Sequence, residues 1–170
     1  FPPASEQETR NEKILSLIKL NESKGHEWID TLPLVIDADG NIAFKEDSDA
    51  LIKEMKSADM LNLNEYASAQ NCFDALVSRY KLSAYSEQDA RKIASVCYEM
   101  KRIYFSISTP YTFAADVPDD VVSLIKENSG FYKGVDVEVI PVRQYTDGTI
   151  APHILGRVGA LDAEENREKN

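Results

Sequence analysis

The chain has 170 residues and a net charge of −10, with 43% hydrophobic and 28% charged residues. These values are typical of an ordinary soluble globular protein, either one domain or two small lobes that share a core. The negative charge excludes duplex nucleic acid and anionic bilayers as partners, because both would repel the chain.

The two ends of the chain give expectations about its surroundings. The sequence opens without Met, on Phe-Pro-Pro, and closes on a polar run. No apolar run reaches the ~20 residues that span a bilayer, and no basic-then-apolar leader opens the chain. We expect a piece of a longer protein, so these absences say little about the parent.

A helix and a hairpin are expected first along the chain. Thr9-Arg-Asn-Glu12 fits a capping box, and the helix that follows it ends at Lys24-Gly25. Residues 32–37 and 42–45 flank Asp39-Gly40-Asn41, a pattern that predicts a β-hairpin.

Three helices are expected next. A short one is predicted near residues 48–60. The segment 64–80 predicts a longer helix, because its apolar and aromatic residues recur at helical spacing. Its inward face holds Tyr66, Gln70, Phe73, Leu76, Val77 and Tyr80. Ser86-Glu-Gln-Asp89 caps the third helix. Its inward residues are Ile93, Val96, Cys97, Met100 and Tyr104.

The remainder predicts a strand, a helix and a second strand. Pro110 breaks the helical pattern, and residues 111–115 then suggest a strand. Pro118 starts a helix that stops at Gly130. Residues 135–139 alternate apolar and acidic side chains, as a half-exposed strand does, and Ile140-Pro141 suggests an edge bulge. This order of elements indicates an α+β fold.

The two cysteines fall on apolar faces of predicted helices. Cys72 and Cys97 are therefore interpreted as buried, inert thiols in preference to a disulfide. The cellular compartment cannot be deduced from them.

Two motifs suggest chemistry that their surroundings do not support. A calcium loop starting at Asp37 would need glycine at its sixth position and glutamate at its twelfth, where Ile42 and Ser48 stand. Ser-x-x-Lys occurs at Ser16–Lys19 and at Ser123–Lys126, inside amphipathic helices, and no Ser-x-Asn or Lys-Thr-Gly partner is present. We interpret the first as a hairpin turn and the second as chance.

The histidines do not build a catalytic or metal site by sequence alone. His26 and His153 lie far apart, without the close spacing of zinc ligands. His153 as a general base would need a nucleophile and an orienting acid, and only Asp147 lies nearby in the sequence. No catalytic residue, cofactor site or metal site is predicted.

The last third of the chain carries short motifs in a fixed order. They are Gly134-Val-Asp-Val-Glu138, Arg143-x-Tyr145-x-x-Gly148, Ala151-x-His153-x-Leu155-Gly156-x-Val158-Gly159 and the acidic pair Glu164-Glu165. In this order they resemble the non-catalytic pedestal, or dimerisation, domain of class B penicillin-binding proteins.

The resemblance extends upstream and covers roughly residues 80–165. Ser86–Ile93 resembles the capped helix of the family, Pro110–Val117 its strand entry and Glu127-Asn128-Ser129 its helix end. Three positions depart from the family pattern, namely Thr146, Pro152 and Arg157. The early R-G-x-(I/V)-x-D-R-x-G segment of the family and its transpeptidase domain are both absent from this sequence.

The resemblance implies a fold, a role and partners. The fold would be α+β, like a penicillin-binding protein dimerisation domain, with short antiparallel strands and a helical insertion. Residues 1–170 would form a single fragment, with 31–130 and 131–165 as possible lobes. The fragment would position its own C-terminal transpeptidase domain for peptidoglycan cross-linking, on the extracytoplasmic face of a membrane where one N-terminal helix anchors the parent.

The same resemblance implies contacts with other proteins. A membrane-embedded glycan polymerase of the SEDS type, or divisome or elongasome proteins, would be partners, and a homodimer is possible. The helical insertion from about Ser48 to Tyr104 is the expected partner surface, because its polar faces are interpreted as free. Cofactors are not implied.

Six residues near the end of the chain are predicted to shape a joint and not an active site. They are Arg143, Tyr145, Gly148, His153, Gly156 and Gly159. An arginine fork can clamp a carboxylate or carbonyl, a tyrosine adds an apolar body with a polar tip, and glycines allow tight turns and close backbone approach.

Two hypotheses from other classes remain open. One is a stand-alone hydrolase that uses His153 with Asp147. The other is an extracellular adhesion or sensor module. The sequence encoded after Asn170 would separate the second from a penicillin-binding protein.

Overall fold

The structure is a computed structural model that describes residues 2, 6–37 and 39–140. It divides into two compact units, Phe1–Val137 and Glu138–Asn170. Every helix and strand that is described belongs to the first unit. None of the described helices combines the length and apolar composition that a membrane-spanning segment requires.

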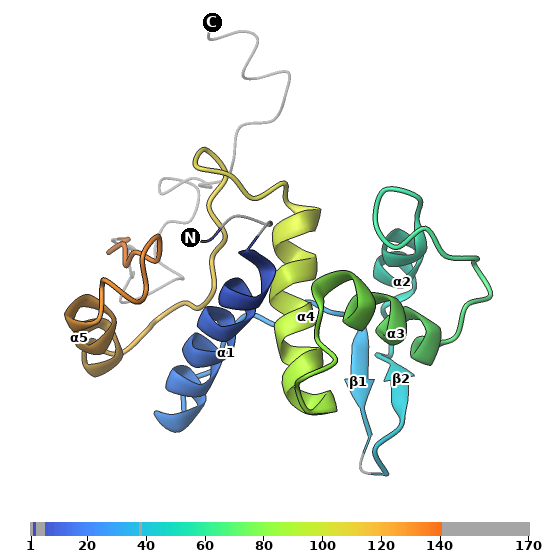
Figure 1. The fold of residues 1–170 in the computed structure, drawn as a ribbon, viewed down its shortest axis with the longest axis horizontal. Helices are drawn as coiled ribbons and strands as arrows, with labels where there is room; N and C mark the ends of the chain where they lie inside the picture. Colours follow the sequence, from blue (N-terminus) through green and yellow to red (C-terminus); the bar gives the residue numbers. More distant parts are fainter. Residues whose placement is uncertain (1, 3–5, 38, 141–170) are drawn as a thin grey trace, which may run out of the picture. The chain divides into compact units, whose positions relative to one another are not determined.

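The first unit is mainly helical and contains one small hairpin (Figure 1). In chain order the elements are α1 (Gln7–Ser23), β1 (Leu34–Ile36), β2 (Ile42–Phe44), α2 (Asp49–Lys56), α3 (Ala69–Tyr80), α4 (Glu87–Arg102) and α5 (Asp119–Glu127). The strands β1 and β2 pair antiparallel, with Leu34 opposite Phe44 and Ile36 opposite Ile42. The helix α4 packs against α1, α3 and β1, and α3 packs against β2, so the hairpin lies beside α3 and α4. The predicted α+β class is confirmed.

The predicted hairpin is confirmed, and Asp37 holds its turn. One carboxylate oxygen of Asp37 accepts the backbone N–H groups of Asp39 and Asn41, at 2.9 and 2.8 Å. The N–H of Asn41 is the largest cause that lowers the pKa of Asp37. Gly40 has φ +85°, which glycine adopts without strain. The Asp37 segment is therefore a hairpin turn, as its sequence indicated.

The helix α4 forms the centre of the main hydrophobic core. Every residue from Ile93 to Met100 is buried, so this stretch of the helix is enclosed on all sides. Ser86 caps the helix as predicted, since its hydroxyl accepts the N–H of Asp89 at 3.2 Å. The predicted inward position of Tyr104 is wrong. The helix ends at Arg102, and Tyr104 is 75% exposed.

The helix α1 contributes to two separate apolar clusters. Ile14 and Ile18 belong to the main core. Leu17 points to a smaller cluster with Val121 and Ile125 of α5, which also contains Tyr132. The Ser16 and Tyr132 hydroxyls lie 2.8 Å apart. The helix α1 therefore joins α5 to the rest of the unit.

The predicted capping box at Thr9 is wrong. The helix α1 begins at Gln7, so Thr9 lies inside it. The reason is the extra turn that Gln7 stabilises, because its buried amide donates to the side chain of Asn11 at 2.7 Å.

Two predicted helices begin or end elsewhere than expected. The helix α2 ends at Lys56, before the predicted end at residue 60. The helix α3 begins at Ala69, after a capping box in which Ser68 and Asn71 exchange hydrogen bonds. Tyr66 therefore precedes α3 and is 87% exposed, so its predicted inward position is wrong.

The two predicted strands outside the hairpin are also wrong. Residues 111–115 pass beside residues 28–29, but a single backbone bond, from Ile29 N–H to Phe113 O, does not make a ladder. The aromatic side chains of this segment instead contribute to packing, since the Phe113 ring stacks on Trp28. Residues 135–139 keep half-buried Val135 and Val137 between exposed acids, yet they form no strand in the described structure.

Both cysteines are free, buried thiols. Burial raises the pKa of each, and that of Cys97 reaches about 11. We therefore predict that the native protein reacts with a thiol reagent at pH 8 more than about 100-fold more slowly than an exposed cysteine does, because the thiolate is the nucleophile.

The measurement is the time course of labelling, with and without urea. Two rapidly labelled thiols are expected in urea. Labelling of either thiol within minutes in the native protein would contradict its buried placement.

Candidate functional site

The residues predicted to form a joint belong to the part of the chain that the structure does not describe. Arg143, Tyr145, Gly148, His153, Gly156 and Gly159 all lie outside the described residues, as do Asp147 and Pro141. Their role as a joint, the edge bulge and the pairing of His153 with Asp147 therefore stay predictions.

The serine hydroxyls of both Ser-x-x-Lys motifs form hydrogen bonds within the fold. Ser16 Oγ bonds the Tyr132 hydroxyl, as described above, and Ser123 Oγ donates to the carbonyl of Asp119 at 2.8 Å. Both serines are thus engaged in packing or in back-bonding to their own helix. Residues 2, 6–37 and 39–140 contain no group of three or more His, Cys, Asp or Glu side chains that could hold a metal ion.

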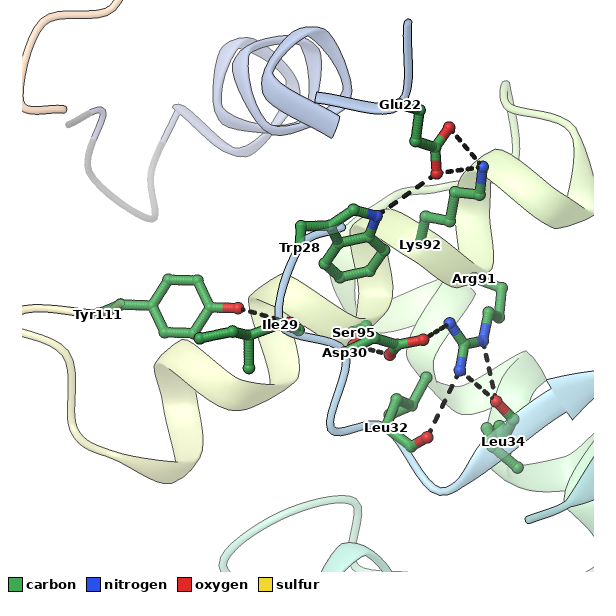
Figure 2. Close-up of polar contacts among 10 residues, drawn as sticks. All are labelled: Glu22, Trp28, Ile29, Asp30, Leu32, Leu34, Arg91, Lys92, Ser95 and Tyr111. Atoms are coloured by element: carbon green, nitrogen blue, oxygen red, sulfur yellow. Dashed lines mark hydrogen bonds and ion pairs between the residues drawn. The ribbon is translucent and has the colours of Figure 1, made fainter. Parts of the chain in front are cut away.

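The most extensive polar arrangement that the structure describes follows one face of α4. Arg91, Ser95, Glu99 and Arg102 are spaced four, four and three residues apart, so they share a face of the helix. Each of these four side chains forms a hydrogen bond either to the segment Asp30–Leu34 or to another residue on the same helix face. We call these four residues the polar stripe. The segment from Asp30 to Leu34 lies along it (Figure 2).

Arg91 is the centre of this arrangement. Its Nε and Nη2 both donate to the carbonyl oxygen of Leu34, at 2.9 and 2.6 Å. Its Nη1 pairs with the carboxylate of Asp30. The Arg91 side chain is only 12% exposed. A planar guanidinium thus connects α4 to the first strand and to the segment that precedes it.

The second oxygen of Asp30 is bonded as well. It accepts the hydroxyl of Ser95 at 2.6 Å, one turn further along α4 (Figure 2). Asp30 therefore binds two residues of the polar stripe at once. One carboxylate reaches both donors because residues four apart lie on neighbouring turns of the same helix face.

Glu99 extends the same pattern to the next turn. Its carboxylate accepts the Thr31 hydroxyl at 2.7 Å and two bonds from Arg102, at 2.9 and 2.7 Å. The bonds from Arg102 are the largest cause that lowers the pKa of Glu99. The Glu99 side chain is 8% exposed, so a charged group is held inside the core by paired donors.

A second group of contacts flanks the polar stripe and joins α1 to α4. Lys92 pairs with Glu22 at 2.7 Å, and the Trp28 indole donates to the same carboxylate at 3.4 Å (Figure 2). The Tyr111 hydroxyl donates to the carbonyl of Ile29 at 3.2 Å. The segment 28–34 is thus fixed from both sides.

This geometry corrects the expectation of free polar faces for one helix of the insertion, α4. Glu99 and Arg91 face the chain's own backbone and side chains, and Ile93–Met100 is buried all round. The four-residue spacing of the polar stripe is the signal that the sequence contains, but this spacing alone predicts a solvated helix face. The difference is the segment Asp30–Leu34, whose position no helical pattern reveals.

Chemically, the polar stripe binds the chain to itself. Its donors and acceptors are bonded to one another, which suits a rigid scaffold more than a ligand site. The family model of the penicillin-binding protein dimerisation domain matches residues 6–170. The chain belongs to this family.

No curated protein matches the chain. The resemblance found in the sequence is nevertheless confirmed by the family model, which extends it from residues 80–165 to residues 6–170. As a penicillin-binding protein dimerisation domain, the chain is a non-catalytic part of such a protein.

We predict that Arg91→Met lowers the free energy of unfolding by about 2–3 kcal/mol, because it removes bonds to Leu34 and leaves the Asp30 carboxylate without its cation. Urea denaturation measures the change. The matched control is Lys92→Met, whose partner Glu22 is 39% exposed, and it should cost less than about 1 kcal/mol. Equal losses in the two variants would contradict the central role of Arg91.

Glu99 predicts a pH dependence of stability. Its pKa in the folded protein lies below the usual value of 4.5, so its contribution is complete above pH 4.5 and is lost as the pH falls through the folded pKa. Unfolding free energies at pH 7 and pH 3 should therefore differ more in the wild type than in Glu99→Gln.

Removal of the Thr31 bond provides a second measurement. Thr31→Val deletes one donor to Glu99, so the folded pKa of Glu99 should rise toward its unfolded value. The acid loss of stability should then be smaller than in the wild type and should be complete at a higher pH. If the difference in unfolding free energy between the wild type and Glu99→Gln did not change with pH, this role of Glu99 would be contradicted.

Proposed function

We propose that this dimerisation domain is the pedestal of a class B penicillin-binding protein, and that it positions a C-terminal transpeptidase domain for peptidoglycan cross-linking. The observation that carries the proposal is the family match over residues 6–170. The parent would be a D,D-transpeptidase on the extracytoplasmic face of the bacterial membrane, anchored by one N-terminal helix.

The packing of the first unit supports a positioning role. A pedestal must hold its shape, and the polar stripe fixes α4 to the segment Asp30–Leu34 through charge-assisted bonds. The helix α1 packs into both apolar clusters, so it links α5 to the same body. Such a body transmits position between its ends better than a flexible linker does.

The proposed role includes protein contacts. Partners would be a membrane-embedded glycan polymerase of the SEDS type, divisome or elongasome proteins, or a second copy of the chain. The middle of α4 is not available for them, because Ile93–Met100 is buried. Contacts therefore fall on α2, on the outer face of α3 or on the loops at the ends of α4.

A fluorescent penicillin tests whether the acylation site lies in the parent's catalytic domain and not in this chain. We predict that the purified chain, residues 1–170, does not become covalently labelled, whereas the parent protein encoded by the intact gene does. A parent with residues 6–140 deleted should still label but should fail to support cell-wall growth, because its catalytic domain is misplaced.

The contradicting outcomes are distinct. Labelling of the purified chain would show an acylation site of its own. A gene that encodes no transpeptidase after residue 170 would instead favour a stand-alone binding or sensor module. Full growth with the deleted parent would refute the positioning role.

A further inference from the structure

We propose that the C-terminal end of α4 is a docking site for a polypeptide segment that carries both carboxylates and apolar side chains. We call it the α4-end site, defined by Arg79, Lys101, Tyr104 and Ile107. The inference rests on the proposed function, because it names the chemistry of one protein partner of the pedestal.

The first observation is the backbone of Tyr104. The helix α4 ends in a Schellman motif, in which the N–H of Phe105 bonds Met100 O at 2.8 Å and the N–H of Tyr104 bonds Lys101 O at 3.2 Å. Tyr104 occupies the left-handed position of that motif, with φ +53°. Glycine is the usual residue there, since a side chain is strained in this conformation.

A tyrosine at this position needs a reason outside the fold. Its side chain is 75% exposed, so burial does not offset the strain. The other non-glycine residues with positive φ in the described chain are Asp47, Asn62, Lys81 and Asp116, and none is aromatic. An exposed aromatic ring on strained backbone is the kind of outlier from which a binding role is inferred.

The second observation is the loop that follows. Ser106 and Thr109 exchange backbone bonds, at 3.1 and 3.2 Å, and so close a tight turn. Ile107 lies within this turn and is fully exposed, at 105%. A fixed turn presents an apolar side chain with little entropy left to lose on binding.

The third observation is an open, concave depression of about 600 Å³ beside Tyr104. It is lined by Gln7, Arg10, Asp59, Arg79, Tyr80, Cys97, Met100, Lys101, Tyr104 and Phe105. Arg79 and Lys101 line it together with one carboxylate, Asp59, in a chain whose net charge is −10. Its size is in the range of sites that take several groups of a ligand, and not a single ion.

The charges at this end of α4 select the partner's chemistry. Residues 100–115 form the longest stretch of the sequence without Asp or Glu. Within the part of the chain that the structure describes, neither Arg79 nor Lys101 forms a salt bridge. The Lys101 ammonium lies 5.8 Å from the centre of the Tyr104 ring. Carboxylates complement these cations, and apolar groups complement Tyr104 and Ile107.

A simpler explanation covers part of this pattern. Arg79 and Lys101 both stand in the last turn of a helix, where cations are stabilised by the helix dipole. It does not explain the strained, exposed Tyr104 or the exposed Ile107. A polypeptide fits better than an anionic bilayer, because the depression is concave and the chain as a whole is acidic.

The first experiment separates binding from folding. The probe is a fluorescent peptide of repeated Glu-Glu-Leu-Phe units, and its matched control has Gln in place of Glu. Tyr104→Gly suits the left-handed position, so it should keep or raise the urea midpoint of the purified chain. The same variant should weaken probe binding at least about tenfold, as should the double variant Arg79→Glu with Lys101→Glu.

Each contrary result would overturn the proposal. Equal binding of the Glu and Gln peptides would remove the charge argument. A lower urea midpoint in Tyr104→Gly would give Tyr104 a purely structural role. Penicillin labelling of the parent is read separately, so failure of the docking site and failure of the pedestal proposal remain distinguishable.

The second experiment uses the intact parent protein in its own cells. A photocrosslinking benzoylphenylalanine replaces Tyr104, and the control places it at Tyr66, which is 87% exposed and outside the α4-end site. We expect an adduct from position 104 to a polypeptide segment that contains Asp or Glu. The adduct should fall about tenfold with Lys101→Glu.

The same experiment has three refuting outcomes. An adduct to lipid would favour a membrane contact over a polypeptide. An adduct to a segment without carboxylates, or an equal adduct from position 66, would refute the assigned chemistry. Absence of any adduct from position 104 would refute the docking site.

Discussion

The complete burial of the middle of α4 is the constraint on which the rest of the described unit depends. Polar groups of a helix enclosed on all sides are costly to bury without internal hydrogen-bond partners. Ser95 and Glu99 find theirs in Asp30 and Thr31, while Arg91 binds Asp30 and the carbonyl of Leu34. The segment that wraps α4 therefore presents Asp30 and Thr31 to polar groups on successive turns of the helix. The hairpin follows directly from that segment and so takes its position from it.

The sequence predicts those elements whose signals are local. The Ser86–Asp89 cap and the Asp39-Gly40 turn each depend on a few neighbouring residues, and both predictions are confirmed. The helical spacing of α3 is confirmed from Phe73 on, whereas Tyr66 and Gln70 are exposed. Errors arise where a distant contact decides. Gln7 extends α1 because it bonds in the core, and Phe113 serves a stack with Trp28 in place of a strand. A glutamate is expected at the surface, but Glu99 is buried, and its carboxylate accepts the hydroxyl of Thr31, which lies far away in the sequence.

The sequence predicts the family of the chain but not the α4-end site. Short motifs in a fixed order identify a family because they report common descent, without any need to know how the residues are placed. The α4-end site has no such motif. Tyr104 takes its unusual conformation only because α4 ends at Arg102, and helix ends are the least predictable feature of a helix. Periodicity alone continues the helix and turns Tyr104 inward, which hides both its exposure and its strain.

The position of α1 between two apolar clusters has a consequence for cooperativity. Ile14 and Ile18 leave the main core only together with the displacement of Leu17 from the cluster of α5. Displacement of α1 from the main core therefore also opens the smaller cluster, so the packing of α5 depends on the larger core.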